Sequence, residues 1–143
     1  MKKACLTKTE IESRLKEKGV QPTLQRISIC QYVLCDADHP TAEDVHAWAE
    51  KNLAKISLAT IYNTLNTLVN AGLLKEFRFA HTDKVIYDNN MDDHYHFLDE
   101  KTQKLFDIEK DQIKLSTDLA KSFKIKEFDI LITGEHNTKR TRP

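Results

Sequence analysis

Two histidines separated by one residue, His94 and His96, stand among acidic residues in the segment YDNNMDDHYHFLDEKTQKLFD. In an extended strand, successive side chains point to opposite faces, so both imidazole rings would emerge on the same face. Two imidazoles on one face are suited to chelate a metal ion. The competing interpretation is a polar strand without a metal, because H-x-H alone is a short motif of low specificity.

Three further side chains could complete a metal shell with this pair. Asp88 ends a predicted hairpin, Asp107 lies in the next predicted strand, and His39 lies between two predicted helices. If all five converge, they supply three imidazoles and two carboxylates. Such a nitrogen and oxygen shell suits Fe(II) or Mn(II) better than a tetrahedral structural zinc site. The predicted metal ligands are therefore His39, Asp88, His94, His96 and Asp107.

The cysteines do not complete such a shell. The chain has three, Cys5, Cys30 and Cys35, an odd count with no C-x-x-C pair. We therefore expect neither a structural zinc on four cysteines nor a disulfide framework.

Composition and charge are those of a globular protein with a cation site in its second half. Charged residues make up 31% of the chain and apolar ones 40%. Residues 81–135 carry 8 basic against 13 acidic residues, whereas residues 1–80 carry 11 against 9. No apolar run approaches the roughly 18 residues of a membrane helix, and the first residues lack a secretory signal. We therefore expect a cytoplasmic protein without membrane contact.

The elements that must position these residues begin with four helical segments. Apolar residues recur at helical spacing in residues 7–19, 23–40, 41–53 and 57–72, and Leu24, Ile27, Trp48 and Leu65 are expected in the core. Residues 73–88 alternate around a Thr-Asp turn, which predicts a hairpin. Helices followed by a hairpin predict a winged helix-turn-helix domain over residues 1–88. The outer face of the fourth helix is short-chained, polar and uncharged, and comprises Ala59, Thr60, Asn63, Thr64, Asn66 and Thr67.

The second part of the chain has a different pattern. Residues 89–93, NNMDD, predict a hinge. Beyond them, strands at 94–98, 104–108 and 127–133 and a helix at 110–123 predict a small α/β domain over residues 94–135, to which the family resemblance given below assigns dimerisation and metal sensing. Its open sheet edge predicts pairing with a second chain in a homodimer. Residues 136–143 are expected to form a disordered tail. The predicted fold class is α+β.

Several of these motifs resemble the ferric uptake regulator family of metal-dependent repressors, along nearly the whole chain. The matching segments are GVQPTLQRISI, HPTAEDV, ISLATIYNTLNTLVNAGLLKE, IYD and DDHYHFLDEKTQKLFDI. The resemblance implies a winged-helix DNA-binding domain and an α/β dimerisation domain. It also places His39, Asp88, His94, His96 and Asp107 at the family's regulatory metal site.

The last of these ligands indicates a branch of the family. Asp107 stands where the peroxide-responsive branch typically has Asp and the iron-sensing branch Glu. The resemblance therefore implies a repressor that senses peroxide by oxidation of His39 or His94 at a site holding Fe(II) or Mn(II), with Zn(II) as an occupant of the isolated protein. The alternative is an iron- or zinc-responsive repressor of this family without peroxide sensing.

The sequence also departs from the family pattern. Most members carry two C-x-x-C pairs for a structural zinc, whereas the corresponding positions here are Asp99, Thr102, His136 and Lys139. The recognition helix usually reads Tyr-Arg, whereas this one reads Tyr62-Asn63. The residues expected to contact double-stranded operator DNA are Gln25, Arg26, Ala59, Thr60, Tyr62, Asn63 and Thr64.

Two other classes of protein are compatible with the same ligands. Three histidines and two aspartates suit a non-haem iron oxygenase or hydrolase, but so short a chain shows no substrate loop. A metal-storage protein would not need the LATIYN helix. We therefore expect a regulator rather than an enzyme.

Overall fold

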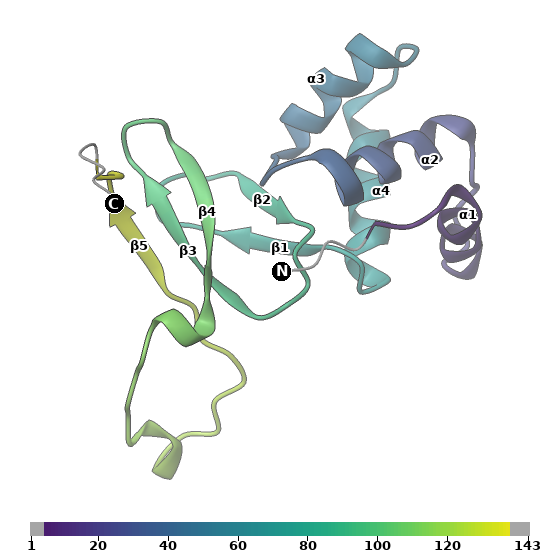
Figure 1. Ribbon diagram of the computed structural model, residues 1–143. Coiled ribbons are helices and arrows are strands. Elements are labelled where there is room, and N and C mark those ends of the chain that lie inside the picture. The colour runs from purple at the N-terminus through teal and green to yellow at the C-terminus, as the bar shows by residue number, and fades with distance from the viewer. Residues whose placement is uncertain (1–4, 138–143) are drawn as a thin grey trace. The chain divides into compact units, whose positions relative to one another are not determined.

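The computed structural model describes residues 5–137, and the chain separates into two compact units, Met1–Asp92 and Asp93–Pro143. Each unit is described by itself. The first is helical with one hairpin, and the second is built on a small sheet (Figure 1). The predicted fold class, α+β with a helical N-terminal part and a smaller C-terminal part, is confirmed. The limits of the predicted hinge at residues 89–93 remain a prediction.

The first unit follows the predicted order of elements. Its helices are α1 (Lys8–Glu17), α2 (Leu24–Gln31), α3 (Ala42–Asn52) and α4 (Leu58–Asn70), and α2 continues into a π-helical turn, η1 (Tyr32–Asp36). Strands β1 (Lys75–Arg78) and β2 (Val85–Asp88) form an antiparallel hairpin.

Side-chain caps explain where the helices begin. Thr41 Oγ1 accepts a hydrogen bond from Asp44 N, and Asp44 Oδ2 accepts one from Thr41 N, which completes a capping box at α3. Ser57 caps α4 by accepting from Thr60 N. Gly72, with φ +75°, follows the end of α4 in the left-handed region that glycine adopts without strain.

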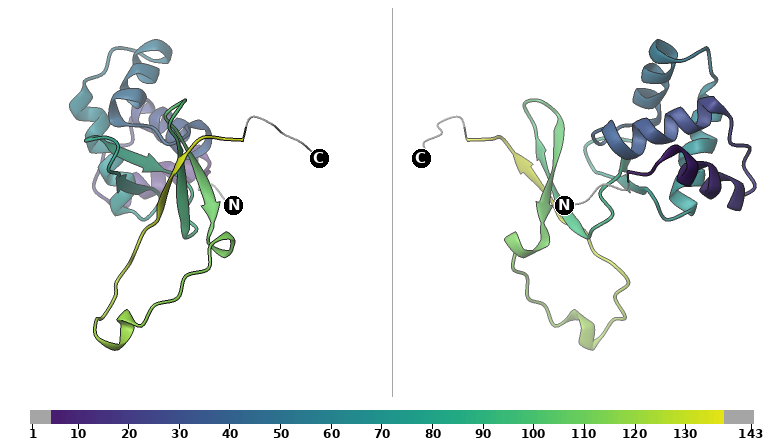
Figure 2. Two further views of the ribbon diagram at one scale, coloured as in Figure 1. Left: turned by 90° about the vertical axis from the view of Figure 1, so that its left-hand side faces the viewer. Right: turned by 45° about the vertical axis from the view of Figure 1, so that its right-hand side comes forward.

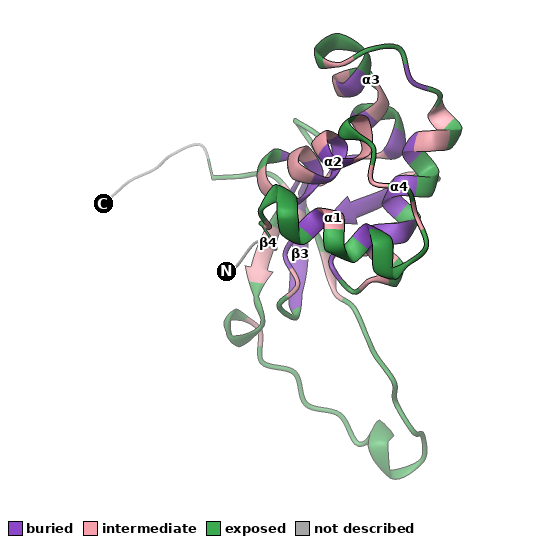
Figure 3. Cartoon of the chain, turned by 90° about the vertical axis from the view of Figure 1, so that its right-hand side faces the viewer, coloured by how far each residue is buried: buried purple, intermediate pink, exposed green. Residues whose placement is uncertain are grey.

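The core of the first unit is formed by the inward stripes of its helices (Figure 3). Ile27 and Leu65 are buried as predicted, and Trp48 is half-buried with its ring stacked on Tyr32 at 4.1 Å between centroids. The prediction for Leu24 is wrong, because its side chain is 80% exposed. Leu24 is the first residue of α2, and its side chain lies on the solvent side of that helix.

The second unit contains a three-stranded sheet. Strands β3 (His94–Asp99), β4 (Lys104–Glu109) and β5 (Leu131–Gly134) lie in the order β4-β3-β5. Strand β3 pairs antiparallel with β4 and parallel with β5. All three predicted strands are present, although the third begins at Leu131 and not at residue 127, and β3 is the central one.

The predicted helix at residues 110–123 is not formed. The structure has only two short 3-10 turns there, η2 (Lys110–Gln112) and η3 (Leu119–Lys121), within an open connection to β5 (Figure 2). Large apolar side chains of this connection are exposed, including Leu119 at 54% and Phe123 at 63%. An isolated short helix is marginal unless its apolar face is packed.

The expectation about cysteines is wrong for one pair. Cys5 and Cys35 form a disulfide, and Cys30 is a buried free thiol. No helix within residues 5–137 combines the length and the apolar character that crossing a membrane requires.

The predicted disordered tail lies mostly outside the described residues, which end at residue 137. Its first residue is ordered: His136 Nδ1 lies 2.8 Å from Asp99 Oδ2. The expected disorder is therefore wrong for His136.

Candidate functional site

His39 lies in the loop between η1 and α3, with an unusual backbone. Its φ of +50° is in the left-handed region, which is uncommon for residues other than glycine. The next residue anchors the loop to the hairpin, because Pro40 O accepts a hydrogen bond from Tyr87 N at 2.9 Å. His39 is therefore held beside the end of β2, where Asp88 lies.

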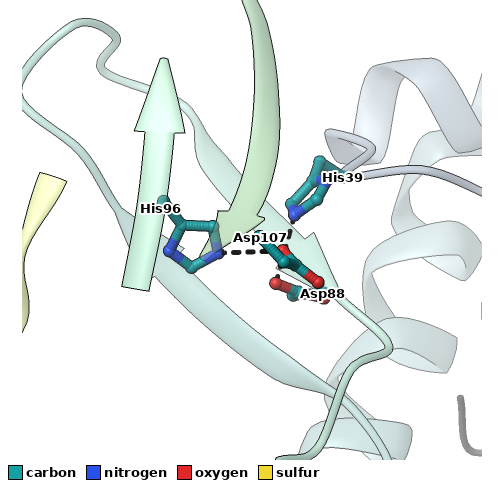
Figure 4. Close-up of side chains that lie close together, drawn as sticks. All are labelled: His39, Asp88, His96 and Asp107. Atoms are coloured by element: carbon teal, nitrogen blue, oxygen red, sulfur yellow. Dashed lines mark ion pairs between the residues drawn. The ribbon is translucent and has the colours of Figure 1, made fainter. Parts of the chain in front are cut away.

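His39 and Asp88 are two of the candidate ligands, and they are called the N-terminal ligand pair below (Figure 4). Their Nε2 and Oδ2 atoms are 3.2 Å apart, and Asp88 is only 2% exposed. The other ring nitrogen of His39, Nδ1, lies 2.7 Å from Asp38 Oδ1. A carboxylate at Nδ1 holds the proton there, which leaves Nε2 as the nitrogen that can bind a metal. Asp88 Oδ1 accepts from Asn90 N at 2.9 Å, so this carboxylate is also oriented.

The other three candidate ligands lie in the second unit and are called the C-terminal ligand trio: His94, His96 and Asp107. His96 is directly opposite Asp107 in the β3–β4 register, and Figure 4 shows this pair. His94 Nε2 and His96 Nε2 are 3.1 Å apart. Asp107 Oδ1 is 3.4 Å from His94 Nε2 and 3.7 Å from His96 Nε2. The prediction that both rings lie on one face of the strand is confirmed.

The donor chemistry of these residues fits a divalent cation. Ligands about 2.0–2.2 Å from one ion, at tetrahedral or octahedral angles, are about 2.8–3.6 Å apart. The separation of 3.1 Å between the two imidazole Nε2 atoms falls in that interval. His39, Asp88, His96 and Asp107 each offer one ligand atom, and none is a sulfur. Both histidines of the trio are buried, at 7% and 2% exposure, which suits fixed ligands better than solvated side chains.

The exposed face of α4 is the candidate surface for DNA. Ala59 and Asn63 are exposed, Tyr62 is 38% exposed, and Thr60 is half-buried beside the Ser57 cap. Thr64 does not belong to this face. It is fully buried, and its hydroxyl donates to Thr60 O at 2.8 Å, so the expectation that it contacts DNA is wrong.

The two predicted contacts on α2 are partly exposed, and one has a structural partner. Gln25 and Arg26 are both half-buried, and Arg26 Nη1 donates to Gln21 O at 3.0 Å. Arg26 also lines a groove of about 480 Å³ between the α1–α2 connection and α4. The groove is lined by Gly19, Val20, Gln21, Arg26, Asn63, Asn66, Thr67 and Asn70.

Some residues of these sites could not be identified from the sequence. Asp38 is one acid among many until the loop brings it to His39. Gln21 and Asn70 are far apart in the chain and meet only at the groove. Asn66 had a sequence signal, since it lies on the polar face of the fourth helix.

The positions that carry cysteines in most members of the resembled family hold a different interaction here. Asp99 Oδ2 is hydrogen-bonded to His136 Nδ1, and the His136 ring lies against Phe97 and Phe106 at 5.7 and 4.7 Å between centroids. Thr102 N donates to Asp99 Oδ1 at 3.4 Å. A carboxylate, an imidazole and a hydroxyl in place of thiolates do not make a tetrahedral thiolate site. Lys139 lies outside the described residues.

Comparisons with known proteins agree with this architecture. The model of the ferric uptake regulator family matches residues 17–133. The peroxide-responsive repressor PerR of Staphylococcus epidermidis is 32% identical over 116 residues, 81% of this chain and 75% of that protein.

Two solved structures share the fold. The ferric uptake regulator Fur of Helicobacter pylori superposes with a TM-score of 0.67 at 14% identity, over 95% of each chain. PerR from Streptococcus pyogenes superposes with a TM-score of 0.52 at 23% identity, again over 95% of each chain. The family match and the identity to the staphylococcal repressor together decide the assignment. The chain belongs to the ferric uptake regulator family, whose members are metal-responsive transcriptional repressors and not enzymes.

Proposed function

We propose that the N-terminal ligand pair and the C-terminal ligand trio bind one divalent cation together, and that this binding makes the protein a repressor of transcription. The observation that carries the proposal is the geometry of the trio. Two buried imidazoles with their Nε2 atoms 3.1 Å apart, beside an aspartate, form a chelating face and not a set of unrelated polar side chains. The pair supplies the remaining nitrogen and carboxylate donors.

The distribution of ligands over both units explains why the metal would control DNA binding. His39 and Asp88 belong to the unit that carries α4, whereas the trio belongs to the unit with the sheet. Ligands from both units hold the units in one arrangement, and they favour it by the difference in metal affinity between the closed and open forms. A fixed arrangement in a dimer sets two α4 helices at a defined spacing for a two-fold operator.

The face of α4 would read the operator. Tyr62 and Asn63 are exposed on it, and an Asn side chain can bond both N6 and N7 of adenine in the major groove. The amides of Gln21, Asn66 and Asn70 in the neighbouring groove are suited to sugar and phosphate contacts that fix the register on the duplex. The absence of Arg beside Tyr62 implies an operator different from that of members with Tyr-Arg.

The family context supports the partners of this repressor. Members act on operator DNA as dimers, and we propose a homodimer for this chain, acting in the cytoplasm where its DNA target would be. The metal would be Fe(II) or Mn(II), with Zn(II) as a further candidate. A relative from Pseudomonas aeruginosa is described with manganese and one from Francisella tularensis with iron.

The signal that we propose is peroxide. The staphylococcal protein at 32% identity is a peroxide-responsive repressor, and Asp107 is the residue type typical of that branch. Bound Fe(II) would supply the electrons that reduce a peroxide beside the ligands. The imidazole rings of His39 and His94 are the groups that would be oxidised. Oxidation of either ring would weaken the set of metal ligands and release the promoter.

The experiment that tests metal-dependent repression uses anaerobically purified protein with Fe(II), Mn(II) and Zn(II) added separately. Metal content and affinity for a selected operator are measured for the wild type, His96→Ala and His81→Ala. His81 lies in the hairpin turn, outside both ligand sets, and serves as the matched control. We expect His96→Ala to abolish metal-dependent DNA binding, with the control unchanged. Undiminished metal-dependent binding by His96→Ala would refute the proposal.

The second candidate function is an iron- or zinc-responsive repressor of the same family without peroxide chemistry. Mass spectrometry of tryptic peptides after peroxide treatment of the Fe(II) form separates the two. Added oxygen on the peptide with His39 or His94 supports peroxide sensing, whereas unmodified peptides support the alternative. Asp107→Glu should reduce the oxidation more than it reduces repression. The longer side chain can still bind the cation, but it would alter the space in which a peroxide could approach.

A further inference from the structure

The disulfide between Cys5 and Cys35 joins two segments that the metal chemistry does not use. The two Cα atoms are 4.8 Å apart, although the residues are separated by 30 positions in the sequence. Cys5 precedes α1 and is exposed, and Cys35 lies in η1 and is half-buried. A disulfide that solvent reaches is one that reductants reach, and accessible disulfides are often labile and regulatory.

The third cysteine shows that this pairing is selective. Cys30 is 0% exposed, and burial raises the pKa of its thiol to about 12. Because the thiolate is the reactive form, a buried thiol with so high a pKa neither attacks an oxidant nor exchanges with a disulfide. Of the three cysteines, Cys5 and Cys35 are therefore the two that can undergo thiol–disulfide chemistry.

Cys35 lies in a segment that leads directly to the N-terminal ligand pair. In η1, Ala37 N donates to Tyr32 O at 2.9 Å, which closes the π-helical turn around Cys35. The side chain of Asn89 donates to Val33 O at 3.0 Å and to Ala37 O at 3.1 Å, on either side of Cys35.

The same contacts reach both members of the pair. Asn89 follows Asp88 in the chain, and Ala37 is two residues before His39. A restraint on Cys35 therefore restrains the backbone that carries the imidazole and its partner.

We propose that Cys5 and Cys35 form a reversible thiol–disulfide switch, with a hydroperoxide or a small disulfide as oxidant. The switch controls how rigid η1 and the loop bearing His39 are. With a hydroperoxide, the Cys5 thiolate attacks one oxygen, and the O–O bond breaks to give a sulfenic acid and water or an alcohol. The Cys35 thiol then displaces the sulfenic oxygen as water. Two thiols lose two electrons to one hydroperoxide, and one S–S bond forms.

The switch differs from oxidation of histidine ligands in three ways. It needs no metal, it is reversed by thiol reductants, and its oxidised form orders the loop instead of destroying a ligand. In a reducing compartment the pair rests as two thiols, so the disulfide forms only under oxidative stress. Oxidised protein has η1 restrained before a cation binds and should bind it more tightly, because less ordering remains to be done. This last step rests on the proposed metal site, whereas the switch itself does not.

The test uses the full chain, metal-free, equilibrated in glutathione buffers from reducing to oxidising, followed by alkylation, peptide mapping and amide hydrogen exchange. We expect a linked Cys5–Cys35 peptide in oxidising buffer and two alkylated cysteines in reducing buffer. Exchange over residues 32–38 should slow in the oxidised form, and the unfolding temperature should rise by roughly 10 °C. Cys5→Ser and Cys35→Ser should each abolish these differences, whereas Cys30→Ala should retain them.

A Mn(II) titration of both forms gives the final readout, with several-fold tighter binding expected for the oxidised form. If Cys5 and Cys35 remain alkylated in every buffer, or if the bond forms without slowing exchange at residues 32–38, the switch is overturned. If neither form binds Mn(II), the proposed metal site fails, and the exchange data still decide the switch. A linked pair with slowed exchange and equal Mn(II) affinity overturns the coupling to His39.

Discussion

At the scale of single residues, the candidate ligands are oriented by neighbours that are not ligands themselves. His39 is the clearest example. Its Nδ1 contacts Asp38, its backbone is in the left-handed region, and its Nε2 lies next to Asp88. Partners of this kind fix the tautomer and orientation of a ligating imidazole.

Replacing Asp38 by Ala should therefore weaken metal binding without removing a ligand. We expect a loss of about 10-fold in Mn(II) affinity, measured by calorimetry, because the ring loses the acceptor that holds its proton on Nδ1. Asp36→Ala, which removes another exposed carboxylate two residues away, is the control. Equal affinities for the two variants would show that Asp38 does not orient His39.

Asp99 gives a pH dependence in the second unit. Its pKa is lowered from an ordinary value near 3.8, first by the hydrogen bond with His136 and then by backbone N–H donors, against the opposing effect of burial. A carboxyl whose pKa is lower in the folded state stabilises the fold above its unfolded pKa, and that contribution is lost as the pH falls through the folded value.

We therefore expect the free energy of unfolding to fall below about pH 4 and to fall less steeply in Asp99→Asn. Urea unfolding at intervals between about pH 2 and pH 6 measures this slope, with Asp111→Asn as the exposed control. The same slope in wild type and Asp99→Asn would contradict the assignment to Asp99.

At the scale of elements, Asn89 connects the end of β2 to η1. Its side-chain amide satisfies two buried carbonyls, Val33 O and Ala37 O, at a place where the π-helical turn leaves backbone acceptors without helical partners. Replacing Asn89 by Ala should cost about 1–3 kcal/mol of stability, because these buried acceptors lose their donor. Urea unfolding measures the loss, and Asn70→Ala, on the exposed end of α4, should be nearly neutral. A neutral Asn89→Ala would mean that water replaces the amide.

Sequence reasoning succeeded where a local pattern is repeated and ended by a cap. The structure confirms the four helices that were predicted from apolar spacing together with Thr41, Ser57 and Gly72. The common face of the trio was predictable because side chains alternate between the two faces of a strand. Thr64 was misplaced because a threonine in a helix can bond its own backbone and be buried, which polarity alone does not reveal. The disulfide was missed because a separation of 30 residues carries no spacing signal.

The helix expected at residues 110–123 failed for a different reason. Its apolar residues would need a partner surface, and none of the described residues of the second unit covers Leu115, Leu119 or Phe123. Periodicity indicates that a segment can form an amphipathic helix, but it does not supply the surface that stabilises one.

At the scale of the whole molecule, these exposed side chains and the outer edges of β4 and β5 are where we expect a second copy to bind. Replacing Phe123, which is 63% exposed, by Asp should weaken self-association by about 10-fold or more, because a charge would be buried without a partner. Sedimentation equilibrium measures the dissociation constant, and Lys121→Asp, an exposed charge reversal nearby, is the control. A dimer of unchanged affinity in Phe123→Asp would place the interface elsewhere.

The order of strands in the second sheet has a consequence for how the proposed metal ion would be acquired. Strand β3 meets β4 across the short turn at residues 100–103, whereas β5 joins β3 only after the open connection of residues 110–130 has been traversed. Short-range contacts form before long-range ones, because closing a longer loop costs more chain entropy. His94, His96 and Asp107 all lie on that hairpin, so a nascent or partly folded chain would already present the proposed chelating face. A cation captured then would guide maturation of the sheet instead of waiting for it.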